Sequence, residues 1–108
     1  ILLMDKFSVT EVAEGISEGQ NYDERLRTEA FSLEVMKFEP GDSDEEHAHE
    51  VDEIYHIDSG SASLEVEGEK QKVASGDVIH LGPETDHHFV DIEEELVVTV
   101  MYAPPEHH

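Results

Sequence analysis

Residues 41–60 read GDSDEEHAHEVDEIYHIDSG, and this stretch does most to indicate the fold. Two histidines, His47 and His49, stand one residue apart near its middle, and Glu53 follows four residues later. Alternate residues of a β-strand share a face, and all three positions have odd numbers. If the segment is extended throughout, two imidazoles and a carboxylate lie on one face, which is a good donor set for a divalent transition metal.

Short strands are predicted on both sides of this stretch. Strand-length apolar segments, several of them alternating with polar residues, are separated by turn signals such as Ser59-Gly60 and Gly82-Pro83. The predicted strands lie within residues 30–36, 51–57, 64–66, 70–74, 78–81, 89–90 and 96–102. Because no convincing helical periodicity follows residue 30, the pattern predicts an all-β sandwich or barrel.

The charge of the chain is extreme. Six Lys and Arg stand against 28 Asp and Glu in 108 residues, for a net charge of −22. Such a surface repels phosphate, so we expect no nucleic-acid partner and no binding to an anionic membrane. Low hydrophobicity with high charge is also typical of disorder, but the alternating strands favour a folded protein adapted to concentrated salt, where charges are screened. We therefore expect a halophilic source.

The chain is expected to be one domain. The barrel is assigned to residues 30–103, an N-terminal arm or strand to residues 1–29 and a tail to residues 104–108, in which His107 and His108 resemble the remnant of an affinity tag. Cysteine is absent, which excludes disulfides and Cys-based zinc sites. No apolar run is long enough for a membrane span or a signal-peptide core, so a cytoplasmic location is expected.

A metal at His47 and His49 needs a further ligand from another strand, and the pair His87-His88 offers one. The alternative is that these histidines are surface groups paired with carboxylates, which are abundant in this chain. Glu53 and the second histidine cluster favour the metal.

The same residues resemble a known family. Gly41, His47-x-His49, Glu53 and Gly60 stand at the spacing of the first conserved motif of the cupin superfamily. Residues 76–81, GDVIHL, are similar to the strand that opens the second motif of that family, and the spacing then selects His87 over His88. The second motif departs from the family pattern, because Gly82 and Glu84 replace its usual Pro and Gly, and Asp91 replaces its frequent Asn.

The resemblance, over roughly residues 30–103, implies a jelly-roll β-barrel of roughly six to eight strands with a metal in its mouth. The implied ligands are His47, His49, Glu53 and His87, which would hold one divalent transition metal, with Fe, Mn, Ni, Co and Zn left open. Octahedral coordination would leave two positions for a small-molecule substrate, water or dioxygen. The family also implies a homodimer, in which the first 29 residues would suit an exchanged arm.

The remaining candidates are interpreted from their positions. Tyr55 shares the face of Glu53, and with His80 it is a candidate catalytic residue, although a packed barrel residue is the simpler interpretation for Tyr55. His88 should point away from His87, and a surface or inter-sheet position is favoured for it over a role in metal binding. His56 is out of phase with Glu53 and is expected on the exterior or at an interface. Surface ion pairs are expected for Arg25 and Arg27, with binding of a substrate carboxylate as the alternative. Core positions are expected for Phe31, Leu33, Val35, Val51, Phe89 and Met101.

Three kinds of function remain open. The first is a metalloenzyme, either dioxygenase-like or isomerase-like, acting on a small organic molecule. The second is a binding or sensing module that holds a metal and a small ligand without turnover. The third is a purely structural metal, which the open coordination positions make less favoured. The fold alone does not choose among them.

Overall fold

The computed structural model describes residues 3–105. It contains one short helix, α1 (Val9–Gly15), followed by eight strands. The strands are β1 (Tyr22–Arg27), β2 (Ser32–Phe38), β3 (Asp52–Ser59), β4 (Ser61–Val66), β5 (Glu69–Ala74), β6 (Val78–Leu81), β7 (His87–Val90) and β8 (Leu96–Ala103). The predicted all-β fold is confirmed.

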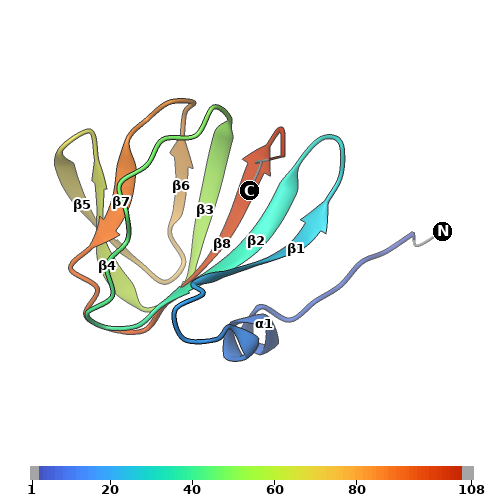
Figure 1. Cartoon of the computed structure of the whole chain (residues 1–108), viewed down its shortest axis with the longest axis horizontal. Coiled ribbons are helices and arrows are strands. Elements are labelled where there is room, and N and C mark those ends of the chain that lie inside the picture. Colours follow the sequence, from blue (N-terminus) through green and yellow to red (C-terminus); the bar gives the residue numbers. More distant parts are fainter. Residues whose placement is uncertain (1–2, 106–108) are drawn as a thin grey trace.

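The strands form two antiparallel sheets that face each other (Figure 1). The larger sheet has the order β1-β2-β8-β3-β6, and the smaller sheet has the order β5-β4-β7. A single isolated bridge between His47 and His87 ties the loop before β3 to β7 in the smaller sheet. This jelly-roll arrangement places the two histidine segments, 40 residues apart in the sequence, side by side.

The apolar core lies between the sheets. Its fully buried members include Ile57 of β3, Phe89 of β7 and Leu96 and Val98 of β8. Burial of aliphatic and aromatic side chains of this size stabilises a fold by roughly 1.5–3 kcal/mol each. Glu34 and Glu53 are the buried acids among residues 3–105, so the other described carboxylates remain at least partly accessible to water.

The N-terminal segment differs from the expected arm or strand, because it contains α1 as well as β1. Ser8 caps the helix by accepting a hydrogen bond from the Glu11 N–H at 3.3 Å. Val12 and Ile16, four residues apart, are buried in a cluster with Val35 on the outer side of β2. Figure 1 shows α1 beside β1 and β2 at one end of the larger sheet. Among residues 3–105, no helix is long and apolar enough to cross a membrane.

The face of β2 that lines the barrel interior is not the one expected from the sequence, because α1 packs on the face that carries Val35. Val35 is buried beneath α1, and Phe31 and Leu33, expected in the core, are only partly buried. The even-numbered residues face the interior instead, and Met36 and Phe38 pack in the main core. Val51 and Met101 are also only partly buried, whereas Phe89 is in the core as expected.

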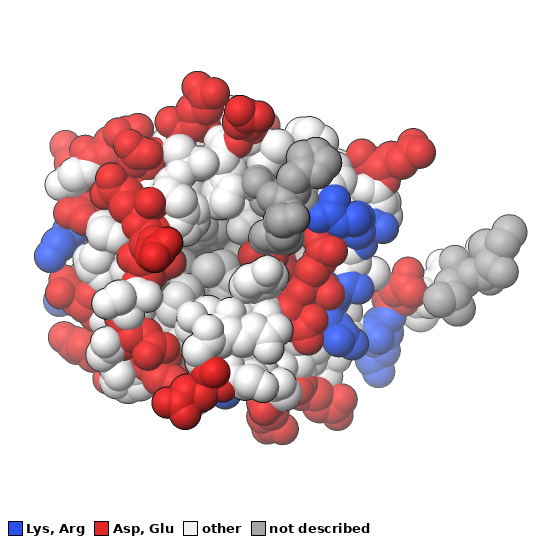
Figure 2. Space-filling view, viewed as in Figure 1, with Lys and Arg blue, Asp and Glu red and all other residues white. Residues whose placement is uncertain are grey.

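Acidic side chains dominate the face seen in Figure 2. They are spread around its margin, and most of the basic side chains visible there gather on the side of β1 and α1, with a smaller group at the opposite edge. Arg25 and Arg27 of β1 pair with Asp23 and Glu24, at 3.5 and 2.7 Å. These are the surface ion pairs expected from the composition.

Candidate metal centre

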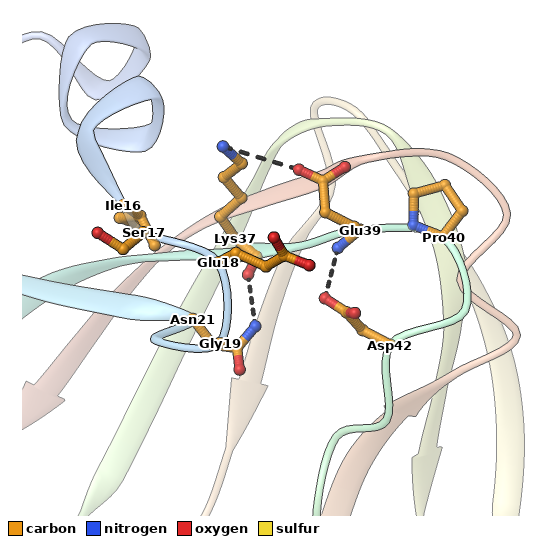
Figure 3. Close-up of a pocket in the computed structure, with 9 residues that line it drawn as sticks. All are labelled: Ile16, Ser17, Glu18, Gly19, Asn21, Lys37, Glu39, Pro40 and Asp42. Atoms are coloured by element: carbon orange, nitrogen blue, oxygen red, sulfur yellow. Dashed lines mark hydrogen bonds and ion pairs between the residues drawn. The ribbon is translucent and has the colours of Figure 1, made fainter.

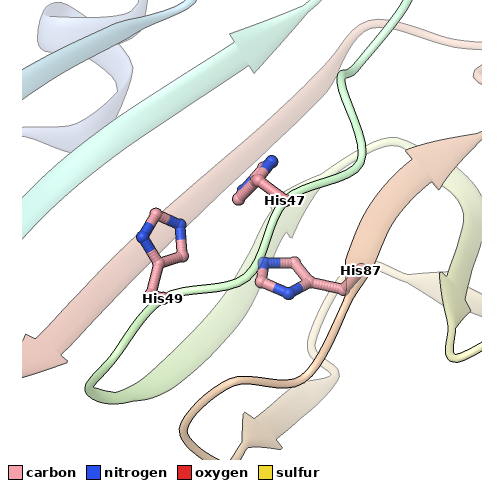
Figure 4. A group of neighbouring side chains, drawn as sticks. All are labelled: His47, His49 and His87. Atoms are coloured by element: carbon pink, nitrogen blue, oxygen red, sulfur yellow. The ribbon is translucent and has the colours of Figure 1, made fainter.

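Three histidines converge inside the mouth of the barrel. His47 and His49 lie on the loop before β3, and His87 begins β7. One ring nitrogen from each lies within 4.8 Å of the others, and the rings meet as Figure 4 shows. We call these three residues the interior imidazole group. Two backbone hydrogen bonds hold it together, from the His47 N–H to the His87 carbonyl at 3.1 Å and from the His87 N–H to the His47 carbonyl at 2.9 Å.

The protonation pattern of two of the rings suits metal binding. His47 Nδ1 lies 2.5 Å from the Glu45 carbonyl oxygen, and His87 Nδ1 lies 2.8 Å from the Thr85 carbonyl oxygen. A carbonyl oxygen only accepts hydrogen bonds, so each Nδ1 carries the hydrogen. Fixing the ring through one nitrogen in this way is how proteins orient a ligating histidine toward a metal with the other nitrogen.

Glu53 lies beside the interior imidazole group. It points inward from β3 and is 1% exposed. Its Oε1 lies 3.4 Å from His87 Nε2 and 3.7 Å from His49 Nε2. A buried carboxylate is costly without a compensating charge, and a divalent cation between these groups would supply one. Three imidazoles and one carboxylate therefore fit a divalent transition metal.

Tyr55 connects two of these groups. Its hydroxyl lies 3.1 Å from Glu53 Oε1 and 2.8 Å from His87 Nε2, and its ring stacks on Phe89. Burial and the neighbouring Glu53 charge raise the pKa of Tyr55 well above 10, so the phenol remains protonated. Burial by itself would lower the pKa of His87, but hydrogen bonds with Glu53 and the Thr85 carbonyl outweigh it and raise that pKa above its usual value.

The other predicted positions lie elsewhere. His80, the second candidate catalytic residue, is exposed on β6 and pairs with Asp52 at 2.9 Å, so the structure does not bring it to the imidazoles. His56 is exposed and pairs with Asp58 at 2.9 Å. His88 faces away from His87 and contacts Glu65.

A buried acid that sequence reasoning missed lies on β2. Glu34 is 3% exposed and accepts a hydrogen bond from the Tyr102 hydroxyl at 3.1 Å. The ring of Tyr102 in turn meets the His49 ring at a centroid distance of 5.2 Å. No local signal identifies Glu34 as buried, because the apolar odd-numbered residues of this strand indicate that the opposite face is the interior one.

A separate pocket lies outside the barrel, between the turn after α1 and the loop after β2 (Figure 3). Its volume is about 410 Å³, and Glu18, Glu39 and Asp42 are among the residues that line it. Its polar groups pair with each other, because Lys37 contacts Glu39 at 3.7 Å and Asp42 accepts from the Glu39 N–H at 2.8 Å. None of the three imidazoles lines it.

The comparisons with known proteins agree with this fold. A family model described as "Cupin domain" matches residues 34–102. An uncharacterized protein of Streptomyces coelicolor is 33% identical over 104 residues, which are 95% of this chain and 99% of that protein.

Solved structures match the fold as well. An uncharacterized conserved protein with a double-stranded beta-helix domain from Klebsiella pneumoniae superposes with a TM-score of 0.82 at 23% identity, covering 94% of this chain and 90% of that one. A protein named KdgF from Halomonas sp. superposes with a TM-score of 0.71 at 27% identity, covering 77% and 76%. The Klebsiella likeness shows the fold alone.

Proposed function

Because the chain belongs to the cupin domain family, we propose that it binds one divalent transition metal and acts as a metalloenzyme on a small organic molecule. The observation that carries the proposal is the interior imidazole group, two of whose rings are oriented by backbone carbonyls, with the buried carboxylate of Glu53 beside it. The ligands proposed are His47, His49, His87 and Glu53.

The metal, when bound, would supply Lewis acidity or redox activity at coordination positions that the protein leaves open. The chain's own residues would manage protons around it. Before metal binds, the Tyr55 hydroxyl would hold Glu53 and His87 in place, because it lies within 3.1 Å of both. The paired Glu34 and Tyr102 form a second proton-holding pair beside His49.

The Glu34–Tyr102 pair favours an isomerase-like or lyase-like reaction among the open choices. Such reactions need a group that takes a proton from carbon and one that returns it, and a buried carboxylate bonded to a phenol is a suitable pair. A dioxygenase-like reaction has less need of that pair. The alternative function is a non-catalytic module that binds or senses a small ligand.

The first experiment measures metal content. His107 and His108, outside the described residues, are replaced by alanine in every sample so that terminal imidazoles do not contribute. Metal-free protein in molar salt is dialysed to equilibrium against Fe²⁺, Mn²⁺, Ni²⁺, Co²⁺ or Zn²⁺, and bound metal is determined by elemental analysis. We expect His49→Ala to lose about one equivalent per chain, and the exposed control His56→Ala to lose none. Equal metal content in both variants would refute the site.

The second experiment separates the reaction classes. Oxygen uptake is measured with thiols, diketones and flavonoids, and proton exchange at carbon is followed by NMR in D₂O with small hydroxy ketones and keto acids. Exchange without oxygen uptake supports the isomerase-like assignment, and exchange should then fall at least about tenfold in Glu34→Gln. Oxygen uptake would favour the dioxygenase-like assignment. Neither activity, with metal bound, would favour the binding module.

The homodimer, the cytoplasmic location and the salt-adapted habitat remain predictions. The first is checked by light scattering at rising salt, because self-repulsion between chains of −22 should weaken as the charges are screened.

A further inference from the structure

A second group of potential metal ligands lies on the outer side of β7. His88 Nε2 lies 2.5 Å from Glu65 Oε2 and 3.7 Å from Glu46 Oε2. One donor atom from each of the three residues lies within 4.8 Å of the others. His88 and Glu65 are partly buried, and Glu46 is exposed. We call these residues the outer group.

The fold assembles the outer group through the same contacts that gather the interior imidazoles. The antiparallel pairing of β4 with β7 sets Glu65 directly opposite His88. The bridge from His47 to His87 holds the loop against β7, and Glu46 is the residue next to that bridge. Neighbouring residues of a strand point to opposite faces, so His87 reaches the interior while His88 reaches the outer group.

The His88 ring is oriented as a ligating histidine is. Its Nδ1 lies 3.2 Å from the Asp44 carbonyl oxygen, which requires the hydrogen to be on Nδ1. Nε2 is then the atom turned toward the two carboxylates. The Asp44 carboxylate accepts a hydrogen bond from the Phe89 N–H at 2.8 Å, and this contact fixes the loop that carries the orienting carbonyl. Backbone support of this kind is typical of metal-binding imidazoles.

A simple ion pair uses only part of this arrangement. A protonated Nε2 has one hydrogen, which Glu65 satisfies at 2.5 Å, and the Glu46 oxygen at 3.7 Å is beyond hydrogen-bond distance. The exposed pairs His80–Asp52 and His56–Asp58 are simple ion pairs, in which one ring nitrogen lies 2.9 Å from one carboxylate oxygen. In the outer group a second carboxylate converges on the same nitrogen, and two carboxylates balance the charge of a divalent cation.

We propose that Glu46, Glu65 and His88 form a second binding site for a divalent transition metal such as Zn²⁺ or Co²⁺, with water completing its coordination. One imidazole and two carboxylates are donors that these ions accept. The site is separate from the interior imidazole group, and it does not rest on the proposed function of that group. The excess of carboxylates in the chain would raise the local concentration of the cation.

The test uses Zn²⁺ alone with metal-free protein carrying the His107→Ala and His108→Ala replacements. Isothermal titration calorimetry and equilibrium dialysis are expected to give about two equivalents for this protein and about one for His88→Ala. The matched control His80→Ala, which removes an exposed imidazole paired with a single carboxylate, is expected to keep both. Glu46→Gln and Glu65→Gln should each lower the affinity for the second Zn²⁺ by about tenfold or more. Circular dichroism confirms that each variant is folded.

The position of the bound metal is determined from Mn²⁺-induced broadening of backbone NMR signals in the His49→Ala variant, which lacks one interior ligand. Broadening centred on Glu65 and His88 supports the outer site, whether or not the interior site exists. Equal Zn²⁺ stoichiometry in His88→Ala and His80→Ala would overturn the proposal. So would an effect of Glu65→Gln without one of Glu46→Gln, because the metal would then be held without the third proposed ligand. Loss of metal in His88→Ala but not in His49→Ala would refute the interior centre alone.

Discussion

Replacing Tyr55 with phenylalanine tests whether its hydroxyl competes with the metal. In the metal-free protein this hydroxyl bonds to Glu53 and His87, two of the proposed ligands. Phenylalanine keeps the ring on Phe89, so the change removes one hydroxyl and leaves the packing intact. A hydrogen bond to a buried charged group contributes about 1.5–3 kcal/mol, and we expect the metal-free Tyr55→Phe protein to lose about that much stability.

The metal-loaded protein should lose much less stability on this substitution, because the metal then binds the Glu53 and His87 atoms to which the hydroxyl was hydrogen-bonded. By thermodynamic linkage the difference appears as metal affinity. At about 1.4 kcal/mol for each factor of ten, Tyr55→Phe is expected to bind metal about tenfold to a hundredfold more tightly. Urea denaturation of metal-free and loaded protein gives the stabilities, and calorimetric titration with Zn²⁺ gives the affinities.

The matched control is Tyr22→Phe, which alters a tyrosine of β1 outside the interior imidazole group and should leave the metal affinity unchanged. Weaker metal binding in Tyr55→Phe would refute the reasoning, because it would show that the hydroxyl supports the ligands when the metal is bound. An unchanged stability of the metal-free protein would show that Glu53 and His87 do not depend on it.

Further predictions concern the turn and the surface. Gly60→Ala places a Cβ 2.1 Å from the Glu95 carbonyl oxygen at a φ of +87°, so we expect urea denaturation to show a loss of about 2–5 kcal/mol in the free energy of unfolding. Gly68→Ala, with a φ of +84° and open space around the new Cβ, should lose only about 1–2 kcal/mol. Equal losses in the two variants would contradict the steric explanation. The hydrogen bond with Glu95 raises the pKa of Glu39 above 4.5, so Glu95→Gln should lower that pKa in an NMR titration. A raised folded-state pKa adds stability below the unfolded value of 4.5 that is lost as pH rises through the folded value; the variant should therefore gain on the native protein above that window, and no gain at neutral pH would contradict this account of the contact between Glu39 and Glu95.

Local sequence patterns predict the fold class well in this protein. Turn residues and apolar alternation predict short strands, and the spacing between Gly41 and Gly60 matches the loop and strand that carry His47, His49 and Glu53. The expectation of continuous extension is only partly met, since His47 lies in an isolated bridge and His49 in a loop. The imidazoles meet through the bridge with β7, a contact between distant segments.

Tertiary packing decides what the sequence could not predict. The helix α1 has only 7 residues, and its stability depends on packing against Val35, which a local pattern does not report. Since α1 covers part of the outer side of β2, Val35 is buried there as well as the residues of the inner face, and alternation no longer identifies the interior. For the same reason the interior position of Glu34 and the convergence of Glu46 on His88 appear only in the folded chain.

The most direct test of the interior centre is an anomalous difference map from crystals of the Zn²⁺-loaded protein, collected at the zinc absorption edge. The account predicts a peak within about 2.0–2.2 Å of one ring nitrogen each of His47, His49 and His87 and of a Glu53 carboxylate oxygen. The absence of that peak, with zinc found only elsewhere in the crystal, would contradict it.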